Sequence, residues 1–226
     1  MIRQTPQADQ FKQQMRDSLQ HETGNSRAVK IARHANVYTC GDQDEMVYFI
    51  ESGQIKLLLL SPEGKECLLA IRSAGDIFGE LCLSGLGARR ETATAMKATT
   101  LKQIPCSGFF ARLSHNALAE GFARYLAVRI ADQQQVIANL VTVDSEQRLG
   151  KTLLHLARTL GKKDPRSIRI EQKISHEELS EMVGTTRPRI SLFMQRFRNL
   201  GLIERNREHF LIIKENKLAD YLGQIA

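Results

Sequence analysis

The sequence predicts an α+β protein, because three patterns follow one another along the chain. Short apolar runs separated by turn residues fill residues 28–106, which is typical of an antiparallel sandwich or barrel. Glycine then disappears after Gly121, and residues 109–143 carry apolar side chains at helical spacing. The last third combines amphipathic helices with a hairpin. A length of 226 residues accommodates one or two domains.

The N-terminal segment, residues 1–25, is polar and rich in glutamine. Its apolar positions with helical spacing are Phe11, Met15 and Leu19. We predict a frayed or short helical lead-in to the β domain, which we place at residues 26–108.

The β domain is predicted from short apolar runs such as VYFI at 47–50, IKLLLL at 55–60 and CLLAI at 67–71. Runs of this length bounded by turn residues are typical of buried strands. The segment SPEGKE at 61–66 is a hairpin-type connection, in which Gly64 can adopt a positive φ.

A long central helix is predicted over residues 109–144. Its apolar stripe advances in steps of three and four residues, with a glutamine at one seam position; the stripe consists of Leu126, Ile130, Gln133, Ile137 and Leu140. Two interpretations are open. The stripe packs on the chain's own barrel, or it forms a two-stranded coiled coil with a second copy. We favour the second interpretation, which predicts a homodimer.

The C-terminal domain is placed at residues 145–226. It begins with an amphipathic helix over 145–160, for which Asp144 or Ser145 is the N-cap. The segment SIRIEQKI at 167–174 alternates like a strand.

Residues 174–213 carry the pattern that is most informative about function. Ser175 and Glu178 have the spacing of a capping box, which predicts a helix that begins after Ser175. Gly184 supplies the tight turn that ends this helix. A second helix therefore follows the first after only a short turn.

The second helix is predicted to begin at Arg187, with Thr186 as its cap and Pro188 in the first turn, where a missing N–H costs nothing. Gly201 ends it. Its predicted buried face consists of Ile190, Phe193, Met194, Phe197 and Leu200.

Two short strands, LIERN and HFLII, then form a hairpin around Asn206, Arg207 and Glu208. Helix, glycine turn, helix and hairpin in this order are the plan of a winged helix-turn-helix. Charge agrees, since residues 145–226 hold 16 Lys and Arg against 10 Asp and Glu, whereas residues 1–144 hold 16 against 15. A basic surface on a helix-turn-helix indicates DNA as the partner.

The start of the second helix carries the groups that DNA recognition needs. Its free amides, hydroxyls and guanidinium groups can meet phosphates and base edges, and an arginine there can pair bidentately with guanine. Arg196 and Arg198 either contact phosphates or form a solvated helix face. The predicted DNA-binding residues are Thr185, Thr186, Arg187, Pro188, Arg189, Ser191 and Arg196.

Several other classes of protein are disfavoured. No apolar run approaches the roughly 20 residues of a membrane span, and the N-terminus has no secretory h-region, so we expect a cytoplasmic protein with no membrane partner. Cys40, Cys67, Cys82 and Cys106 include no close pair, which predicts reduced structural thiols and no metal site. GxSxG, HExxH and P-loop patterns are absent, so we expect no enzyme.

At this point the chain resembles the CRP/FNR family of bacterial regulators from about residue 28 to 213. The resemblance is carried by VYTCGDQDEMVYFIESGQIKLLLLSPEGKE, by AGDIFGELCL and by VGTTRPRIS. It implies a double-stranded β-helix or jelly-roll barrel of the cyclic-nucleotide-binding type, a dimerising central helix and a C-terminal winged helix-turn-helix. It further implies a palindromic double-stranded DNA operator and RNA polymerase as partners.

The resemblance also implies an effector pocket. Glu80 corresponds to the residue that accepts the ribose hydroxyl, and Arg89 or Arg90 to the arginine that holds the cyclic phosphate. Glu91 follows where the family has Ser or Thr, and its charge would repel a phosphate. The candidate effector-binding residues are Phe78, Gly79, Glu80, Leu81, Arg89, Arg90, Thr92, Gln133 and Gln134.

Three interpretations of the effector stay open: cAMP, another cyclic nucleotide such as cyclic di-GMP, and no nucleotide. Gln133 and Gln134 stand where cAMP-responsive members have a Thr-Ser pair facing adenine, and an amide can hydrogen-bond adenine. No cysteine precedes Cys40, so we expect no iron–sulfur cluster.

The recognition helix departs from the family as well. Arg187-Pro188 replaces the usual Arg-Glu start, and Leu192 replaces a second arginine. We therefore expect an operator that differs from the best-known half-site, with Arg189 as the replacement reader. Two alternatives remain, a nucleotide-responsive module that acts by protein contacts and a regulator of this family that needs no nucleotide.

Overall fold

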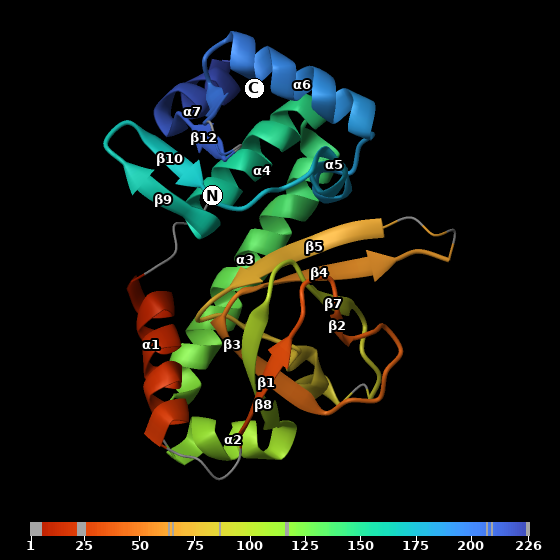
Figure 1. Ribbon diagram of the computed structural model, residues 1–226, viewed down its shortest axis with the longest axis vertical. Helices are drawn as coiled ribbons and strands as arrows, with labels where there is room; N and C mark the ends of the chain where they lie inside the picture. Colours follow the sequence, from red (N-terminus) through yellow and green to blue (C-terminus); the bar gives the residue numbers. More distant parts are fainter. Residues whose placement is uncertain are drawn as a thin grey trace. The chain divides into compact units, whose positions relative to one another are not determined.

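The structure of the chain, a computed structural model, describes residues 6–21, 26–62, 64, 66–85, 87–115, 118–206, 208 and 210–224. The chain divides after Arg129 into an N-terminal and a C-terminal unit (Figure 1). The division falls inside helix α3, so each unit contains part of it. The predicted segments 1–5 and 22–25 of the lead-in lie outside the described residues.

The elements up to the end of the central helix are α1 (Pro6–His21), β1 (Arg27–Ile31), β2 (Asn36–Tyr38), β3 (Met46–Ser52), β4 (Gln54–Leu60), β5 (Glu66–Ser73), β6 (Ile77–Phe78), the 3-10 helix η1 (Glu80–Ser84), β7 (Thr92–Ala95), β8 (Thr99–Pro105), α2 (Cys106–His115) and α3 (Ala119–Thr142). They are followed by α4 (Ser145–Leu160), β9 (Gly161–Asp164), β10 (Ser167–Ile170), α5 (His176–Val183), α6 (Arg187–Asn199), β11 (Ile203–Arg205), β12 (Leu211–Ile213) and α7 (Glu215–Gln224).

Two antiparallel four-stranded sheets, in the orders β1-β8-β3-β6 and β2-β7-β4-β5, form the β-roll of the N-terminal unit. Alternating strand residues from the two sheets meet in one apolar core, which contains Tyr38, Tyr48, Ile50, Ile55, Leu57, Phe78, Ala93, Ala95 and Leu101. Burial of one face of each sheet fixes the register of its strands. The predicted all-β barrel is confirmed.

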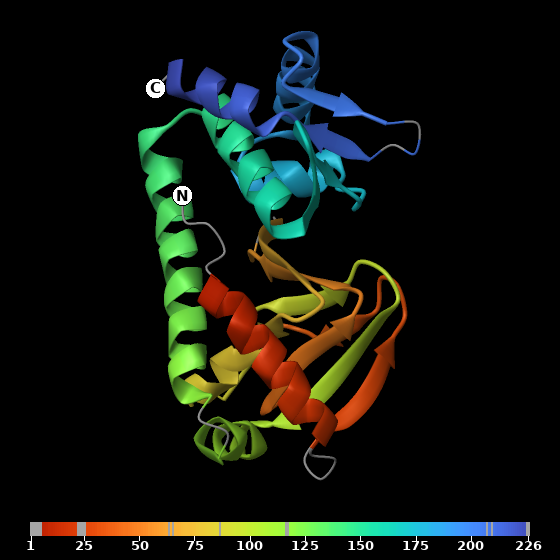
Figure 2. The ribbon, with the colours of Figure 1, turned by 90° about the vertical axis from the view of Figure 1, so that its left-hand side faces the viewer.

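Residues 6–21 form helix α1, as the helical alternative predicted, and this helix is part of the core, so the frayed alternative is wrong. Phe11, Met15 and Leu19 are 4% exposed or less. Phe11 packs against the helix α3 rings of Phe122 and Tyr125, with centroids 5.8 and 5.3 Å away, and α1 lies alongside the first half of α3 (Figure 2). Three apolar residues in 16 suffice for a helix when its single apolar face is covered.

The predicted central helix is two helices. Residues 106–115 form α2, and the long helix begins only at Ala119. The amide of Leu118 donates to the Leu113 carbonyl over 3.1 Å and the Leu118 side chain is buried. The separate α2 can therefore bury Phe109 and Leu113 against the β-roll, which one straight helix over 109–144 would not allow.

The C-terminal unit combines the second part of α3 and helices α4, α5, α6 and α7 with an antiparallel sheet in the order β11-β12-β10-β9. The Asp144 side chain accepts from the Gln147 amide over 2.8 Å and caps α4 as predicted. Helix α7 packs on α4 where Gly150 leaves room for Leu222. The two predicted wing strands are thus the edge of a larger sheet.

Candidate nucleic-acid interface and effector pocket

The helix-turn-helix is formed by α5 and α6 and is built from local signals. The Ser175 hydroxyl accepts from the Glu178 amide over 3.1 Å, and the Glu178 carboxylate accepts from the Ser175 amide over 2.9 Å. This reciprocal capping box starts α5 as predicted. Gly184 ends it at φ 67°, a left-handed conformation that costs a residue with a side chain more.

Helix α6 buries one face and exposes its first turn. Ile190, Phe193, Met194 and Phe197 are at most 8% exposed, which confirms most of the predicted buried face. Leu200 was predicted in this face and is 50% exposed, because it follows the last helical residue and points off the helix axis.

The predicted capping role of Thr186 holds only for the backbone. Thr186 is the N-cap by conformation, yet its side chain makes no capping hydrogen bond. The amides of the first turn and the Thr186 hydroxyl therefore stay available to an outside acceptor. Thr186, Arg187, Pro188 and Arg189 are all exposed.

The exposed first turn carries two arginines on one helix end. Arg187 has a single weak ion pair, with its Nε 4.0 Å from the Glu177 carboxylate and both side chains more than 60% exposed. Thr185, in the turn, is half-buried. A cationic helix N-terminus with uncommitted donors is suited to phosphates and base edges.

Ser191 and Arg196 are engaged within the protein. The Ser191 hydroxyl lies 2.8 Å from His176 Nδ1. Arg196 Nη1 donates to the Glu146 carboxylate over 3.0 Å, and the other oxygen of Glu146 accepts from the Tyr221 hydroxyl over 2.7 Å. Arg196 thus links α6 to α4, although its side chain is 61% exposed.

The wing is the hairpin of β11 and β12, in which Ile203 pairs with Ile213 and Arg205 with Leu211. The Asn206 side chain accepts from the amides of Glu208 and Phe210 and so shapes the turn. Arg207 lies outside the described residues. Figure 2 shows the hairpin projecting from the rest of its unit, beside α6 in the chain order of a winged helix.

Arg148 was not predicted, and it positions the turn of the helix-turn-helix. From α4 its guanidinium donates to the Val183 carbonyl over 2.9 Å and to the Val143 carbonyl over 2.7 Å. A methyl added at Gly184 would lie 3.3 Å from Leu140 of α3. The end of α3, the start of α4 and the turn before α6 are therefore held together, a non-local arrangement that no sequence pattern indicates.

The effector segment of the β-roll begins with a strained glycine. Gly79 has φ 77°, and a methyl there would lie 2.9 Å from Arg89 Nη1 and 3.1 Å from the Met46 carbonyl. Only glycine fits this close approach. Phe78, before it, is fully buried and stacks on Tyr48 with centroids 5.0 Å apart. Leu81, after it, is 46% exposed.

Arg89 lies inside the β-roll, 4% exposed, with its hydrogen bonds committed to the protein. Nη1 donates to the Gly79 carbonyl over 2.7 Å, and Nη2 donates to the Asp44 carboxylate over 2.9 Å and to the Met46 carbonyl. The guanidinium lies 4.1 Å from the centre of the Tyr38 ring, a cation–π distance. Burial acts to lower the pKa of Arg89, but the Asp44 hydrogen bond and charge outweigh it and raise this pKa.

Three further ionisable groups face the same interior, namely Glu80, Arg129 and Glu91. Glu80 Oε1 pairs with Arg129 Nη2 of α3 over 2.6 Å, and both side chains are about nine-tenths buried. Glu91 is 5% exposed and accepts from the Tyr38 hydroxyl over 2.9 Å. Burial, with help from the nearby Glu80 charge, raises the pKa of Glu91, while the Tyr38 hydrogen bond opposes the rise. Glu80 Oε2 and Arg89 Nε make no hydrogen bond with the described residues.

The remaining predicted effector residues are dispersed. Arg90 is exposed, and the Thr92 hydroxyl accepts from the Cys40 amide over 3.0 Å. Gln133 and Gln134 are exposed on α3, in the C-terminal unit. Within the N-terminal unit the structure brings together the predicted residues Gly79, Glu80 and Arg89. Four further residues join them: Asp44, Tyr38, Glu91 and Arg129. Of these four, only Glu91 had been singled out from the sequence, as a charge that would repel a phosphate.

The predicted dimer seam is largely uncovered. Ile130, Ile137 and Leu140 are 54%, 62% and 48% exposed, and Val136 and Val141 extend the apolar surface at 52% and 84%. Leu126, in contrast, packs partly against its own core. A run of exposed aliphatic side chains on one helix marks an interaction surface.

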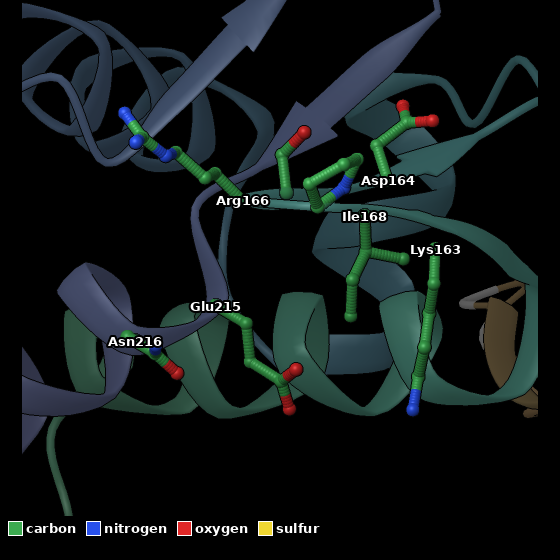
Figure 3. A pocket seen from close by; sticks show the side chains of 8 residues that line it. Lys163, Asp164, Arg166, Ile168, Glu215 and Asn216 are labelled. Atoms are coloured by element: carbon green, nitrogen blue, oxygen red, sulfur yellow. The ribbon is translucent and has the colours of Figure 1, made fainter.

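The C-terminal unit has a separate, shallow polar pocket between the β9–β10 turn and the start of α7 (Figure 3). Glu215 in its wall pairs with Arg158 over 2.7 Å. None of the predicted DNA-binding or effector-binding residues lines it. Among the described residues no helix has both the length and the apolarity to cross a membrane.

A β-roll joined through a long helix to an exposed, basic winged helix-turn-helix defines a two-part DNA-binding regulator. A family model described as "Cyclic nucleotide-binding domain" matches residues 28–116, and one described as "Crp-like helix-turn-helix domain" matches residues 147–221. The chain belongs to the CRP/FNR family of transcriptional regulators, and it combines the family's DNA-binding helix-turn-helix with its cyclic-nucleotide-binding domain.

Relatives of known function agree. The chain is 31% identical over 175 residues to the transcriptional regulator LdrP of Thermus thermophilus, covering 77% of this chain and 86% of the relative. It is 28% identical over 200 residues to a CRP-like cAMP-activated global transcriptional regulator of Mycobacterium tuberculosis, covering 87% and 88%. The solved structure of a CooA mutant from Carboxydothermus hydrogenoformans superposes with a TM-score of 0.75, at 27% identity, over 91% of this chain and 94% of that chain.

Proposed function

We propose that the chain binds a palindromic operator as a homodimer, with the first turn of α6 from each copy in the major groove. One observation carries the proposal: the cationic N-terminus of α6 is exposed with its donors uncommitted, while the opposite helix face is buried. The family acts as dimers on DNA. Two copies of one helix then require two half-sites about one helical turn apart.

Within this interface the residues have different roles. Arg189 reads a base, because it is exposed on the first turn where an arginine can reach guanine O6 and N7. Thr185, Thr186 and Arg187 contact phosphates and fix the register. Pro188 sets the helix start, and Ser191 contributes a hydroxyl. Arg196 acts mainly by holding α6 on α4 through Glu146.

Selection of bound duplexes from a random pool tests this proposal. We expect a two-fold symmetric site, and an affinity that falls steeply with salt because several phosphates release their counterions. Unselective binding, or no binding at low salt, contradicts it. Because the function is exercised on DNA and with RNA polymerase, we expect it in the cytoplasm, with regulation and not catalysis as its activity.

The described residues fit a cyclic phosphate poorly. Arg89 would have to leave Asp44 and two carbonyls, and Glu91 lies buried in the same interior. Glu80 fits a ribose hydroxyl better, since its Oε2 is buried without a hydrogen bond. We therefore propose that the β-roll receives a signal other than a cyclic phosphate bound at Arg89.

Isothermal titration with cAMP and, separately, with cyclic di-GMP tests the fit. We expect no binding heat from either nucleotide. Heat from cAMP that disappears in Gln133→Ala would overturn this proposal and would restore the nucleotide interpretation.

A signal can act only if it binds two arrangements of the dimer unequally. Leu140, whose side chain would lie 3.3 Å from a methyl added at Gly184, offers a route by which α3 pairing reaches α6.

A further inference from the structure

His176 joins the three parts of the recognition surface. It is the first residue of α5 and is half-buried. Its Nδ1 lies 2.8 Å from the Ser191 hydroxyl of α6, and its Nε2 lies 3.5 Å from Arg205 Nη2 of the wing strand β11. One imidazole therefore contacts the recognition helix and the wing at once.

The chemistry of Arg205 selects one arrangement of protons. A guanidinium only donates hydrogen bonds, so Nε2 has to accept from it. Nδ1 of a neutral imidazole then carries the hydrogen and donates to Ser191 Oγ. The hydroxyl hydrogen of Ser191 is thereby left free to donate outward, to an acceptor on DNA.

We propose that His176 is a positioning residue for DNA recognition, which orients the Ser191 hydroxyl as a donor and holds Arg205 of the wing beside it. The inference rests on the proposed function, because it assigns a direction to a hydroxyl in the proposed interface. It leaves the Ser191 hydrogen available to a base or backbone acceptor, since that hydrogen is not used in the contact with His176.

The charges around His176 keep the imidazole neutral. Burial lowers the pKa of His176, and the cations facing it lower this pKa further: Arg205 from β11, and Arg198 and Arg187 from α6. On its own helix, the adjacent Glu177 pairs with Arg187, and Glu178 accepts from the Ser175 amide in the capping box. Once protonated, Nε2 would carry a hydrogen and could no longer accept from Arg205.

The test measures discrimination. The affinity for the operator that the wild type selects from a random pool is divided by the affinity for single-base variants of that operator. His176→Ala should lower this ratio about three- to tenfold at the position that Ser191 contacts, the effect of one hydrogen bond. His176→Asn, whose amide nitrogen can donate in place of Nδ1, should restore most of it. Circular dichroism melting confirms that each variant is folded.

A double-mutant cycle and a pH series complete the test. Ser191→Ala should show the same loss as His176→Ala, and adding His176→Ala to it should cost nothing more. The wild-type ratio should fall between pH 8 and pH 5.5, and that of His176→Asn should not. The inference is overturned if His176→Ala lowers the discrimination ratio equally in wild type and in Ser191→Ala. It is also overturned if wild type and His176→Asn have identical pH profiles. If the wild type selects no operator at all, the proposed function has failed instead.

Discussion

At the scale of single residues, the interior of the β-roll is the most informative part of the chain. Arg89 and Glu91 are buried among apolar strands, and the half-buried Asp44 pairs with Arg89. Buried charges persist only when they are paired and hydrogen-bonded. The Arg89 Nη atoms meet that requirement through Asp44 and two carbonyls, so this pairing contributes to stability.

Arg89→Ala should lower the free energy of unfolding by about 3 kcal/mol or more, because it leaves Asp44 and two carbonyls with fewer partners. Its matched control is Arg90→Ala, since Arg90 is adjacent and exposed; its effect should stay within about 0.5 kcal/mol. Urea denaturation at one protein concentration measures both. Equal effects would show that the buried network is not formed.

Glu91→Gln should stabilise the fold at pH 7. The pKa of Glu91 is raised in the folded state, so the folded protein favours the protonated form. The stabilisation that the protonated Glu91 carboxyl gives the folded state is therefore complete below the pKa that this group has in the unfolded chain. It is lost as the pH rises through the higher pKa of the folded protein. Glutamine keeps an acceptor for the Tyr38 hydroxyl. We expect the free energy of unfolding of Glu91→Gln to exceed that of wild type by less at about pH 4.5 than at pH 7. Urea denaturation across this pH range measures the difference. A difference that does not change with pH would contradict the prediction.

At the scale of elements, helices α6 and α1 show that neighbouring elements decide what the charged or apolar residues of a helix do. Helix α6 has arginines at both ends, and they differ in role: Glu146 engages Arg196, whereas Arg187 and Arg189 of the first turn are exposed. Helix α1 has only three apolar residues on one face, yet it packs fully because α3 offers a matching surface at Gly121.

Arg189→Ala should weaken binding to the selected operator by about 1–3 kcal/mol, roughly 5- to 150-fold, and abolish preference at one base pair. Arg196→Ala should have a smaller effect on preference and should lower thermal stability, because it releases Glu146 and loosens α6 from α4. Gel shifts with single-base operator variants, together with melting curves, separate the two roles. A loss of base preference in Arg196→Ala alone would reverse the assignment.

Phe11→Ala should destabilise the N-terminal unit by about 3–5 kcal/mol, as expected for removing a ring that is 1% exposed and packed on two others. Gln14→Ala, on the exposed side of α1, is the control and should be neutral. Chemical denaturation of the full chain is the measurement. If Phe11→Ala behaved like its control, α1 would not be docked.

At the scale of the whole molecule, function requires two copies. The exposed aliphatic side chains of Ile130, Ile137 and Val141 on α3 are the surface that a second copy would cover. A dimer binds the full operator much more tightly than one copy binds a half-site, because the second half-site is bound intramolecularly.

Ile137→Glu should therefore produce monomers in analytical ultracentrifugation and weaken binding to the full operator by about a hundredfold or more, while half-site binding stays. Ala138→Glu is the control. It is exposed on α3 and is displaced by about 100° around the helix from Ile137, so it should remain dimeric. Dimers with Ile137→Glu would mean that another surface holds the copies together.

Features that depend on neighbours along the chain could be predicted from the residues alone. The capping box of Ser175 and Glu178, the turn at Gly184 and the buried face of α6 are local signals, so they predicted the helix-turn-helix and its exposed first turn. Short apolar runs bounded by turn residues likewise predicted the β-roll. Helix α7 was not predicted, although Leu218 and Leu222 have the spacing of a buried helix face.

The contacts between polar side chains, in contrast, became apparent only in the folded chain. Arg89 reaches Asp44 across 45 residues, Arg196 reaches Glu146 across 50, and His176 reaches Ser191 from another helix. Such pairings depend on how elements pack, and a charge or hydroxyl has no period that reveals its partner. The physical reason is range: caps and turns act over about four residues, whereas burial and ion pairing act through space after the chain has folded.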